Sequence, residues 1–185
     1  VEEGIKDATK LVNVMTKKCV IIGKKYNGGY SGGKGVIVGT PATQKNPGML
    51  RRFGKFVQTL NGRFQTGTDM NINLKDIEYM AEQSDFIDGL EAGLGDTAIP
   101  TAFGVLLAMK ELCKWKYGSE SLKDKVIAVQ GVGSVGKDLV RRLVEEGAEV
   151  IATDVNAEII RSVKDEWGIR IVSPEEIYSV KCDIF

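Results

Sequence analysis

The sequence predicts an α/β protein whose C-terminal part is a doubly wound parallel sheet. From residue 123 onward, short apolar runs alternate strictly with segments of helical pattern. Strands that are joined by helices lie parallel, because each helical crossover returns the chain to the same end of the sheet. The run at 126–130 also leads into Gly-Val-Gly-Ser-Val-Gly at 131–136, a pattern that is typical of the turn between a strand and a helix.

The three glycines of this turn have separate expected tasks. Gly131 allows the tight turn, Gly133 lets the backbone approach a pyrophosphate, and Gly136 lets the helix pack closely against the strand. The helix then begins at Ser134 and Val135, where free N–H groups and the helix dipole favour a phosphate. A glycine-rich turn by itself is weak evidence, because such a turn can serve the backbone alone.

An acidic residue after the second apolar run makes a dinucleotide site the better interpretation. Asp154 follows the strand predicted at 149–153, and the acid that binds ribose hydroxyls lies about 20 residues after the glycine turn in Rossmann-type folds. A carboxylate at this point accepts hydrogen bonds from the ribose and repels a 2′-phosphate. The combination of strand, glycine turn, helix and acid therefore predicts a Rossmann-type domain that binds NAD rather than NADP.

The other elements of this part follow from the same alternation. Ser173, Pro174 and Glu176 combine a cap, a proline at the first helical position and a capping-box glutamate, which indicates a helix start. The expected strands are 126–130, 149–153, 169–172 and 182–185, and the expected helices are 134–146, 156–167 and 174–179.

The N-terminal part is less regular, and its elements are predicted from apolar spacing and from caps. Helical periodicity predicts a helix over 3–17. Asparagine caps predict two more helices, from Asn46-Pro47 to Asn61-Gly62 and from Asn73 to Met80. Further elements are expected as follows: strands at 36–38 and 64–66, short apolar pieces at 20–22 and 86–87, and a long helix from Pro100 to about Trp115.

These elements predict two domains. We expect a substrate-binding and catalytic domain over 1–118, ending in the long bridging helix, and a nucleotide-binding domain over 119–185. Val1 is not an initiator methionine, and residues 183–185 stop inside an apolar run. We therefore interpret the chain as a segment of a longer protein.

Composition narrows the classes of partner and chemistry. The 185 residues are 43% hydrophobic, and 25 basic side chains balance 25 acidic ones, which favours neither nucleic acid nor a membrane surface as partner. No apolar run approaches the roughly 20 residues that span a bilayer. Cys19, Cys113 and Cys182 lie far apart without metal-site spacing and predict reduced thiols in a cytoplasmic protein. Histidine is absent, which excludes histidine-based triads and imidazole–metal chemistry.

Three charged residues are candidates for chemistry in the N-terminal part. Lys34 lies between glycines just before a predicted strand, and a lysine in a dry cleft can lose its proton near neutral pH. A second cation such as Lys18 would lower that pKa further. Asp69 follows Thr66-Gly67-Thr68 at a loop position where functional carboxylates often lie. The same residues also fit solvated surface lysines and a loop or capping carboxylate, and spacing alone leaves both interpretations open.

Several motifs in unbroken order resemble the Glu/Leu/Phe/Val amino-acid dehydrogenase family. The resemblance covers nearly the whole chain, and over 63–80 and 119–185 it is closest to leucine, phenylalanine and valine dehydrogenases. The motifs are Met15-Thr16-Lys17-Lys18, Gly32 to Pro41, Leu60 to Phe64, Thr66 to Met70, Gly95-Asp96, Pro100 to Val105, Gln130 to Gly136 and Cys182 to Phe185.

The resemblance implies a reaction and a role for each candidate residue. The reaction is the NAD-dependent oxidative deamination of an L-amino acid to a 2-oxo acid and ammonia, in a cytoplasmic homo-oligomer. Lys18 would hold the substrate α-carboxylate, and Lys34 would activate the catalytic water. Asp69 would carry a proton to or from the amino group, and Thr101 would face the nicotinamide side of the cleft.

The sequence departs from the family pattern at four places. About four residues, 24–27, look inserted between the two lysines. Ser31 replaces a glycine, Gly28 replaces an aliphatic residue, and Asn71 stands where a glycine follows the aspartate. Because of the insertion, a non-catalytic dinucleotide-binding relative is kept as the alternative class of protein. Glutamate is kept as an alternative substrate to an aliphatic or aromatic amino acid, because the residues that set the side-chain specificity of the family lie outside this sequence.

Overall fold

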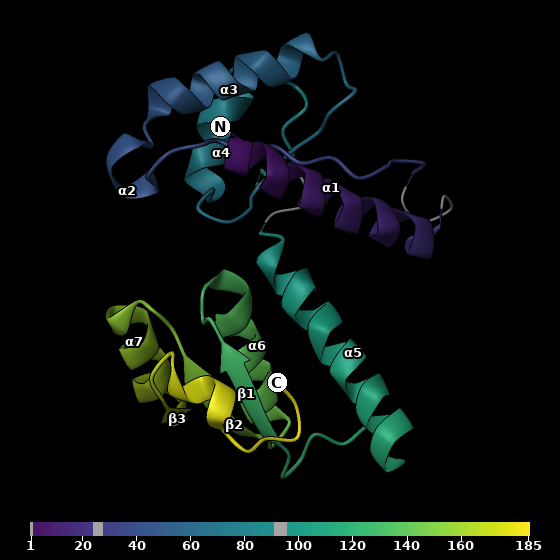
Figure 1. Cartoon of the computed structure of the whole chain (residues 1–185), viewed down its shortest axis with the longest axis vertical. Helices are drawn as coiled ribbons and strands as arrows, with labels where there is room; N and C mark the ends of the chain where they lie inside the picture. Colours follow the sequence, from purple (N-terminus) through teal and green to yellow (C-terminus); the bar gives the residue numbers. More distant parts are fainter. Residues whose placement is uncertain (1, 24–27, 91–95) are drawn as a thin grey trace. The chain divides into compact units, whose positions relative to one another are not determined.

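A computed structural model describes residues 2–23, 28–90 and 96–185. The chain forms two compact units, one up to Asp96 and the other from Thr97 to Phe185 (Figure 1). The second unit contains a parallel sheet with helices, so the predicted α/β class is confirmed. The division after Asp96 lies earlier than the domain boundary expected after residue 118, because the long helix packs with the second unit.

The sheet of the second unit has the order β1-β2-β3 and is parallel throughout. Its register pairs Val126 with Glu149 and Gln130 with Thr153. The predicted alternation is confirmed here, because every strand is followed by a helical segment. The elements are β1 (Val126–Gln130), α6 (Ser134–Glu145), β2 (Glu149–Thr153), α7 (Ala157–Trp167), β3 (Arg170–Ile171) and the 3₁₀ helix η1 (Glu176–Ser179).

Two predicted elements of this unit are shorter in the structure. The strand expected over 169–172 is reduced to the two residues of β3, and the helix expected over 174–179 is the short η1. The expected strand at 182–185 contributes a single parallel bridge, between Ile184 and Ile127 on the side of β1 away from β2. Phe185, the next residue, does not extend the ladder. Its ring stacks on that of Tyr178 at a centroid distance of 5.9 Å.

The long helix α5 (Ala98–Tyr117) lies against α6. It begins two residues before Pro100, which is tolerated because residues of the first turn have no helical acceptor for their N–H groups. Lys110 Nζ donates to Glu146 Oε1 at 2.7 Å, which ties the two helices together. Gly118 ends the helix in the left-handed region at φ +76°. The face of α5 that is buried in the core consists of Ala102, Leu106, Met109 and Cys113.

The first unit is built from helices and irregular segments. Its helices are α1 (Glu2–Ile22), α2 (Pro41–Gln44), α3 (Pro47–Thr59) and α4 (Leu74–Ala81). Asn46 and Asn73 cap α3 and α4 through their side chains, as predicted. Helix α1 runs on through the apolar piece at 20–22, so it is longer than the helix predicted over 3–17. The core of this unit is formed by Leu50, Val57, Ile77, Met80 and Ile87.

The two strands predicted for this unit are wrong as continuous strands. Residues 36–38 form no ladder with the described residues, and Val36 and Val38 are exposed. The expected strand at 64–66 is reduced to one parallel bridge between Thr66 and Ile87. Apolar alternation indicates a preference for extended backbone, whereas a strand also needs a paired neighbour.

Among the described residues, no helix is long and apolar enough to cross a bilayer.

Candidate functional site

The loop that carries Lys34 is held by close contacts of its glycines. A side chain at Gly32 would overlap the backbone of Met15 and Thr16 in α1. A Cβ at Gly33 would lie 3.0 Å from the ring of Phe64. The loop therefore lies against the backbone of α1 because residue 32 has no Cβ, and glycine at position 33 allows its close approach to the ring. Its position fixes where the Lys34 side chain begins.

Asp69 lies at the start of a tight turn. Asp69 and Ile72 exchange both backbone hydrogen bonds, at 3.2 and 2.9 Å. Asp69 Oδ1 also accepts from the Met70 N–H at 2.7 Å, which orients the carboxylate. Asn71 has φ +61°, and asparagine adopts this left-handed conformation more readily than other non-glycine residues. The departure from the family glycine at this position is thus compatible with the turn.

Lys34 and Asp69 are brought together as an ion pair between Nζ and Oδ2. The Lys34 side chain is 18% exposed and the Asp69 side chain 53% exposed, so the amine is sheltered while the carboxylate reaches solvent. Burial lowers the pKa of Lys34 from the ordinary lysine value of 10.5. A sheltered amine beside a solvent-facing carboxylate can accept a proton and exchange it with the surroundings.

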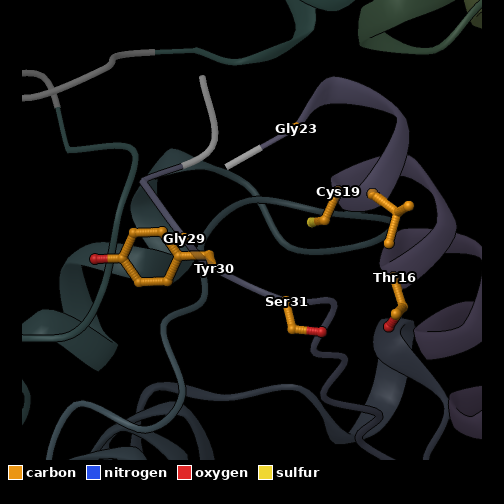
Figure 2. A pocket seen from close by; sticks show the side chains of 7 residues that line it. Thr16, Cys19, Gly23, Gly29, Tyr30 and Ser31 are labelled. Carbon is orange, nitrogen blue, oxygen red and sulfur yellow. The ribbon is translucent and has the colours of Figure 1, made fainter. Parts of the chain in front are cut away.

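Lys18 is exposed on α1, the helix against which Gly32 packs. Close to it in the sequence, a hollow of about 310 Å³ lies between the C-terminal half of α1 and residues 29–31 (Figure 2). Neither Lys18 nor Lys34 lines this hollow. Figure 2 shows Thr16 and Ser31 on its facing sides. The insertion expected at 24–27 lies outside the described residues.

Sequence reasoning missed Lys45, which contacts the Asp69 turn, and the partner of Lys45, Asp76. Lys45 Nζ donates to the Asn71 carbonyl at 2.9 Å and to Asp76 Oδ2 at 2.6 Å. Asp76 is 6% exposed, and it forms a reciprocal capping box with Asn73 at the start of α4. The Asn-x-x-Asp spacing could have indicated that box. No local pattern indicates the contact with Lys45, which is 31 residues away from Asp76 in the chain.

The glycine turn of the second unit has the geometry of a dinucleotide cradle. Gly131 has φ +89°, and a Cβ at Gly136 would overlap the Gly131 carbonyl oxygen. A Cβ at Gly133 would meet no atom within 4 Å, so space is open in front of this backbone. Helix α6 begins at Ser134 without a side-chain cap, which leaves its first N–H groups available to an anion. These residues fit the pyrophosphate of a dinucleotide.

The other two predicted site residues of this unit are Asp154, which directly follows β2, and Thr101, which lies in the first turn of α5. Asp154 Oδ2 accepts from the Val132 N–H at 2.8 Å, and its Oδ1 accepts from the Asn156 N–H at 2.8 Å. The acid is therefore oriented by the glycine turn, and its oxygens keep lone pairs for ribose hydroxyls. Thr101 is exposed near the start of α5, and its hydroxyl donates to the Thr97 carbonyl at 2.7 Å.

Alanine substitutions at the two glycines separate folding from binding. Because a Cβ at position 136 overlaps backbone, we expect Gly136→Ala to cost about 1–3 kcal/mol of unfolding free energy. Gly133 is the N-cap residue of α6 and has open space before it, so we expect Gly133→Ala to change stability less than Gly136→Ala does. On the prediction that this turn holds NAD, the added methyl group should weaken NAD binding. Thermal unfolding and calorimetric titration with NAD check both. Equal melting temperatures for the two variants would contradict the assignment.

Comparisons with known proteins cover both units. Residues 2–86 match the family described as Glu/Leu/Phe/Val dehydrogenase, dimerisation domain, and residues 93–185 match Glutamate/Leucine/Phenylalanine/Valine dehydrogenase. The chain is 42% identical to leucine dehydrogenase of Geobacillus stearothermophilus and 39% identical to phenylalanine dehydrogenase of Lysinibacillus sphaericus. Both alignments cover 100% of this chain and 50% of the relative. The chain thus spans about half the length of the curated relatives it matches.

Two solved structures of amino-acid dehydrogenases are similar to this chain over nearly its whole length. L-tryptophan dehydrogenase from Nostoc punctiforme superposes with a TM-score of 0.66 at 36% identity, over 100% of this chain and 51% of that one. A hetero-hexameric glutamate dehydrogenase from Thermus thermophilus superposes with a TM-score of 0.76 at 18% identity, over 96% of this chain and 49% of that one. The second likeness is one of fold alone.

Proposed function

Because the chain belongs to the Glu/Leu/Phe/Val dehydrogenase family, we propose that the whole protein oxidatively deaminates an L-amino acid to the 2-oxo acid and ammonia with NAD. The observation that carries this proposal is the pairing of a sheltered amine, Lys34, with the carboxylate of Asp69. Such a pair matches the chemistry of the reaction, which consumes one water and moves protons at the substrate nitrogen and at that water.

The reaction needs a base for water. NAD, when bound, supplies the acceptor for the two electrons that leave the substrate Cα with its hydrogen. The resulting substrate imine is attacked by water only if the water loses a proton. The neutral amine of Lys34 accepts this proton, and burial favours the neutral form. Asp69 then carries a proton to the departing amino group, from a side chain that reaches solvent.

Two further residues would bind and orient the reactants. Lys18, exposed and cationic, suits the α-carboxylate of the substrate. Thr101 would face the nicotinamide. The dinucleotide would be held by Gly131, Gly133, Gly136 and the N–H groups at Ser134 and Val135, and Asp154 would bind the ribose and disfavour a 2′-phosphate.

The substrate we propose is aliphatic or aromatic. Leucine, phenylalanine and tryptophan dehydrogenases are among the proteins to which this chain is 36–42% identical. Glutamate stays the second candidate substrate. A homo-oligomer is also proposed, since residues 2–86 match a domain described as a dimerisation domain.

The test is an assay of NADH formation by the whole protein, across a panel of L-amino acids at alkaline pH. We expect turnover with L-leucine or L-phenylalanine, and little with L-glutamate. Turnover with L-glutamate alone would show that the substrate is glutamate and would contradict an aliphatic or aromatic substrate. No turnover with any amino acid, together with intact NAD binding, would support the non-catalytic relative and contradict the proposal.

The pH dependence of turnover follows from the pKa of Lys34. Only the neutral amine is a base, so kcat at saturating substrate is low below the Lys34 pKa and rises as pH increases through it. Because burial lowers this pKa, we expect the midpoint of the rise to lie below 10.5. A kcat that is flat from pH 7 to 11 would contradict the role of Lys34 as base.

A further inference from the structure

We propose that Lys45 is a positioning residue, which fixes the Asp69 turn by tying its Asn71 carbonyl to the buried carboxylate of Asp76. This inference rests on the proposed function, because it assigns Lys45 to the same reaction. Lys45, Asn71 and Asp76 together form what we call the Lys45 strap. Lys45 does not touch the proposed catalytic pair in any recorded contact of the described residues, so its effect would reach Asp69 through the turn.

The strap is anchored at the buried carboxylate of Asp76. Asp76 is 6% exposed and accepts two hydrogen bonds on Oδ2, from Lys45 Nζ at 2.6 Å and from the Asn73 N–H at 2.9 Å. Helix α4 packs closely on α3. The two backbones lie so near each other at Gly54 of α3 that a side chain there would overlap the Met80 carbonyl of α4. The Lys45 amine is thus bound to a rigid, buried point of the unit.

The strap holds the turn that begins at Asp69 by its Asn71 carbonyl. Asn71 is the residue at φ +61° in the turn between Asp69 and Ile72, and its carbonyl accepts from Lys45 Nζ at 2.9 Å. On its other side the turn follows the Thr66 segment, whose carbonyl accepts from the Asp88 N–H at 2.7 Å. Asp69 therefore lies between one backbone anchor and one side-chain anchor. Removing Lys45 takes away the side-chain anchor, while the backbone anchor and the packing of Ile72 on the core of the unit remain.

The proposed reaction depends on the position of Asp69 relative to Lys34. A displacement of about 1 Å in a reacting group can cost about 100-fold in rate. Lys34 forms an ion pair with Asp69. The loop that carries Lys34 packs on the α1 backbone and on the rings of Phe53 and Phe64. A carboxylate beside an amine favours the charged amine, so withdrawal of Asp69 would lower the pKa of Lys34.

The test compares Lys45→Met with Arg51→Met in the whole protein. Arg51, on α3, likewise bonds a carboxylate at α4, through two bonds to Glu82 at 2.6 and 3.0 Å, but it does not contact the turn. We expect Lys45→Met to lower kcat by about 10- to 100-fold and to move the midpoint of the pH profile downward. Arg51→Met should leave both unchanged, and Lys45→Arg should restore most of kcat.

Amide hydrogen exchange reads the turn without any turnover. In Lys45→Met, exchange at the Asp69 and Ile72 amides should quicken, because these amides form the paired bonds of the turn. If Lys45→Met does not fold with Asp76 left unpaired, Lys45→Met/Asp76→Asn removes the stranded charge and keeps an oxygen for the Asn73 N–H. Inactive wild-type protein would refute the proposed function, while exchange would still test the strap.

Three results would overturn the positioning role. The first is unchanged exchange at the two turn amides in Lys45→Met. The second is faster exchange with unchanged kcat and pH midpoint, which would mean that the strap is structural only. The third is an equal loss of kcat in Arg51→Met.

Discussion

Lys34→Ala is expected to lower kcat for oxidative deamination by about 10²- to 10⁴-fold, the range that is typical for the loss of a general base. The physical reason is that alanine offers no group to accept the proton of the attacking water. The Kd for NAD should stay within about twofold, because Lys34 is not among the residues proposed to hold the dinucleotide. Steady-state NADH formation and calorimetric NAD binding measure the two quantities on the same preparation.

Lys55→Ala is the matched control for this variant. Lys55 is an exposed lysine on α3 in the same unit, with no recorded partner among the described residues. We expect it to leave kcat and NAD binding unchanged. Wild-type turnover in Lys34→Ala would remove Lys34 from the mechanism. A parallel loss in Lys55→Ala would attribute the effect to surface charge.

Asp69→Asn is expected to lower kcat by at least about 100-fold, as for a residue that transfers a proton in the transition state. Asparagine keeps an oxygen that can accept from the Met70 N–H, so the turn is retained. The substitution removes a negative charge beside Lys34, which by itself makes the neutral amine more abundant. A fall in kcat therefore reports the proton-carrying role of Asp69 separately from the charge state of Lys34.

The outcome that contradicts this role is a kcat equal to or above that of the wild type. Asp88→Asn serves as the control, because Asp88 is an exposed carboxylate on the segment that pairs with Thr66. Its side chain is not part of the Lys34 pair. Comparable losses in Asp69→Asn and Asp88→Asn would indicate a general effect of acidic charge in this region.

Local signals explain which parts of the fold were predictable. The caps Asn46 and Asn73 act on N–H groups within three residues, so a short pattern contains all the partners. The sequence from 126 to 154 likewise contains a strand, its glycine turn, the helix and the next strand, and all four are confirmed.

Elements that depend on distant partners were predicted less well. Residues 36–38 have the composition of a strand but no ladder among the described residues, and 182–185 form a single bridge to β1. The Lys45–Asp76 contact likewise joins residues 31 positions apart. A one-dimensional pattern records propensity, whereas pairing depends on which segments meet in space.

The candidate site divides in the same way. Spacing alone left Lys34 and Asp69 open to interpretation as ordinary surface charges, and the resemblance favoured a joint role. Their ion pair brings together residues from two separate loops. The roles of these two residues, and those of Lys18 and Thr101, stay predictions.

The most direct measurement is an NMR titration of the Lys34 side chain in the whole protein, with ¹³C-labelled lysine and Lys34→Arg to identify its Cε resonance. The proposed mechanism requires that the sheltered amine gives up its proton more easily than an ordinary lysine. We predict a titration midpoint below 10.5. A midpoint at or above 10.5 would mean that the amine stays charged through the working range, and it would contradict the assignment of Lys34 as the base.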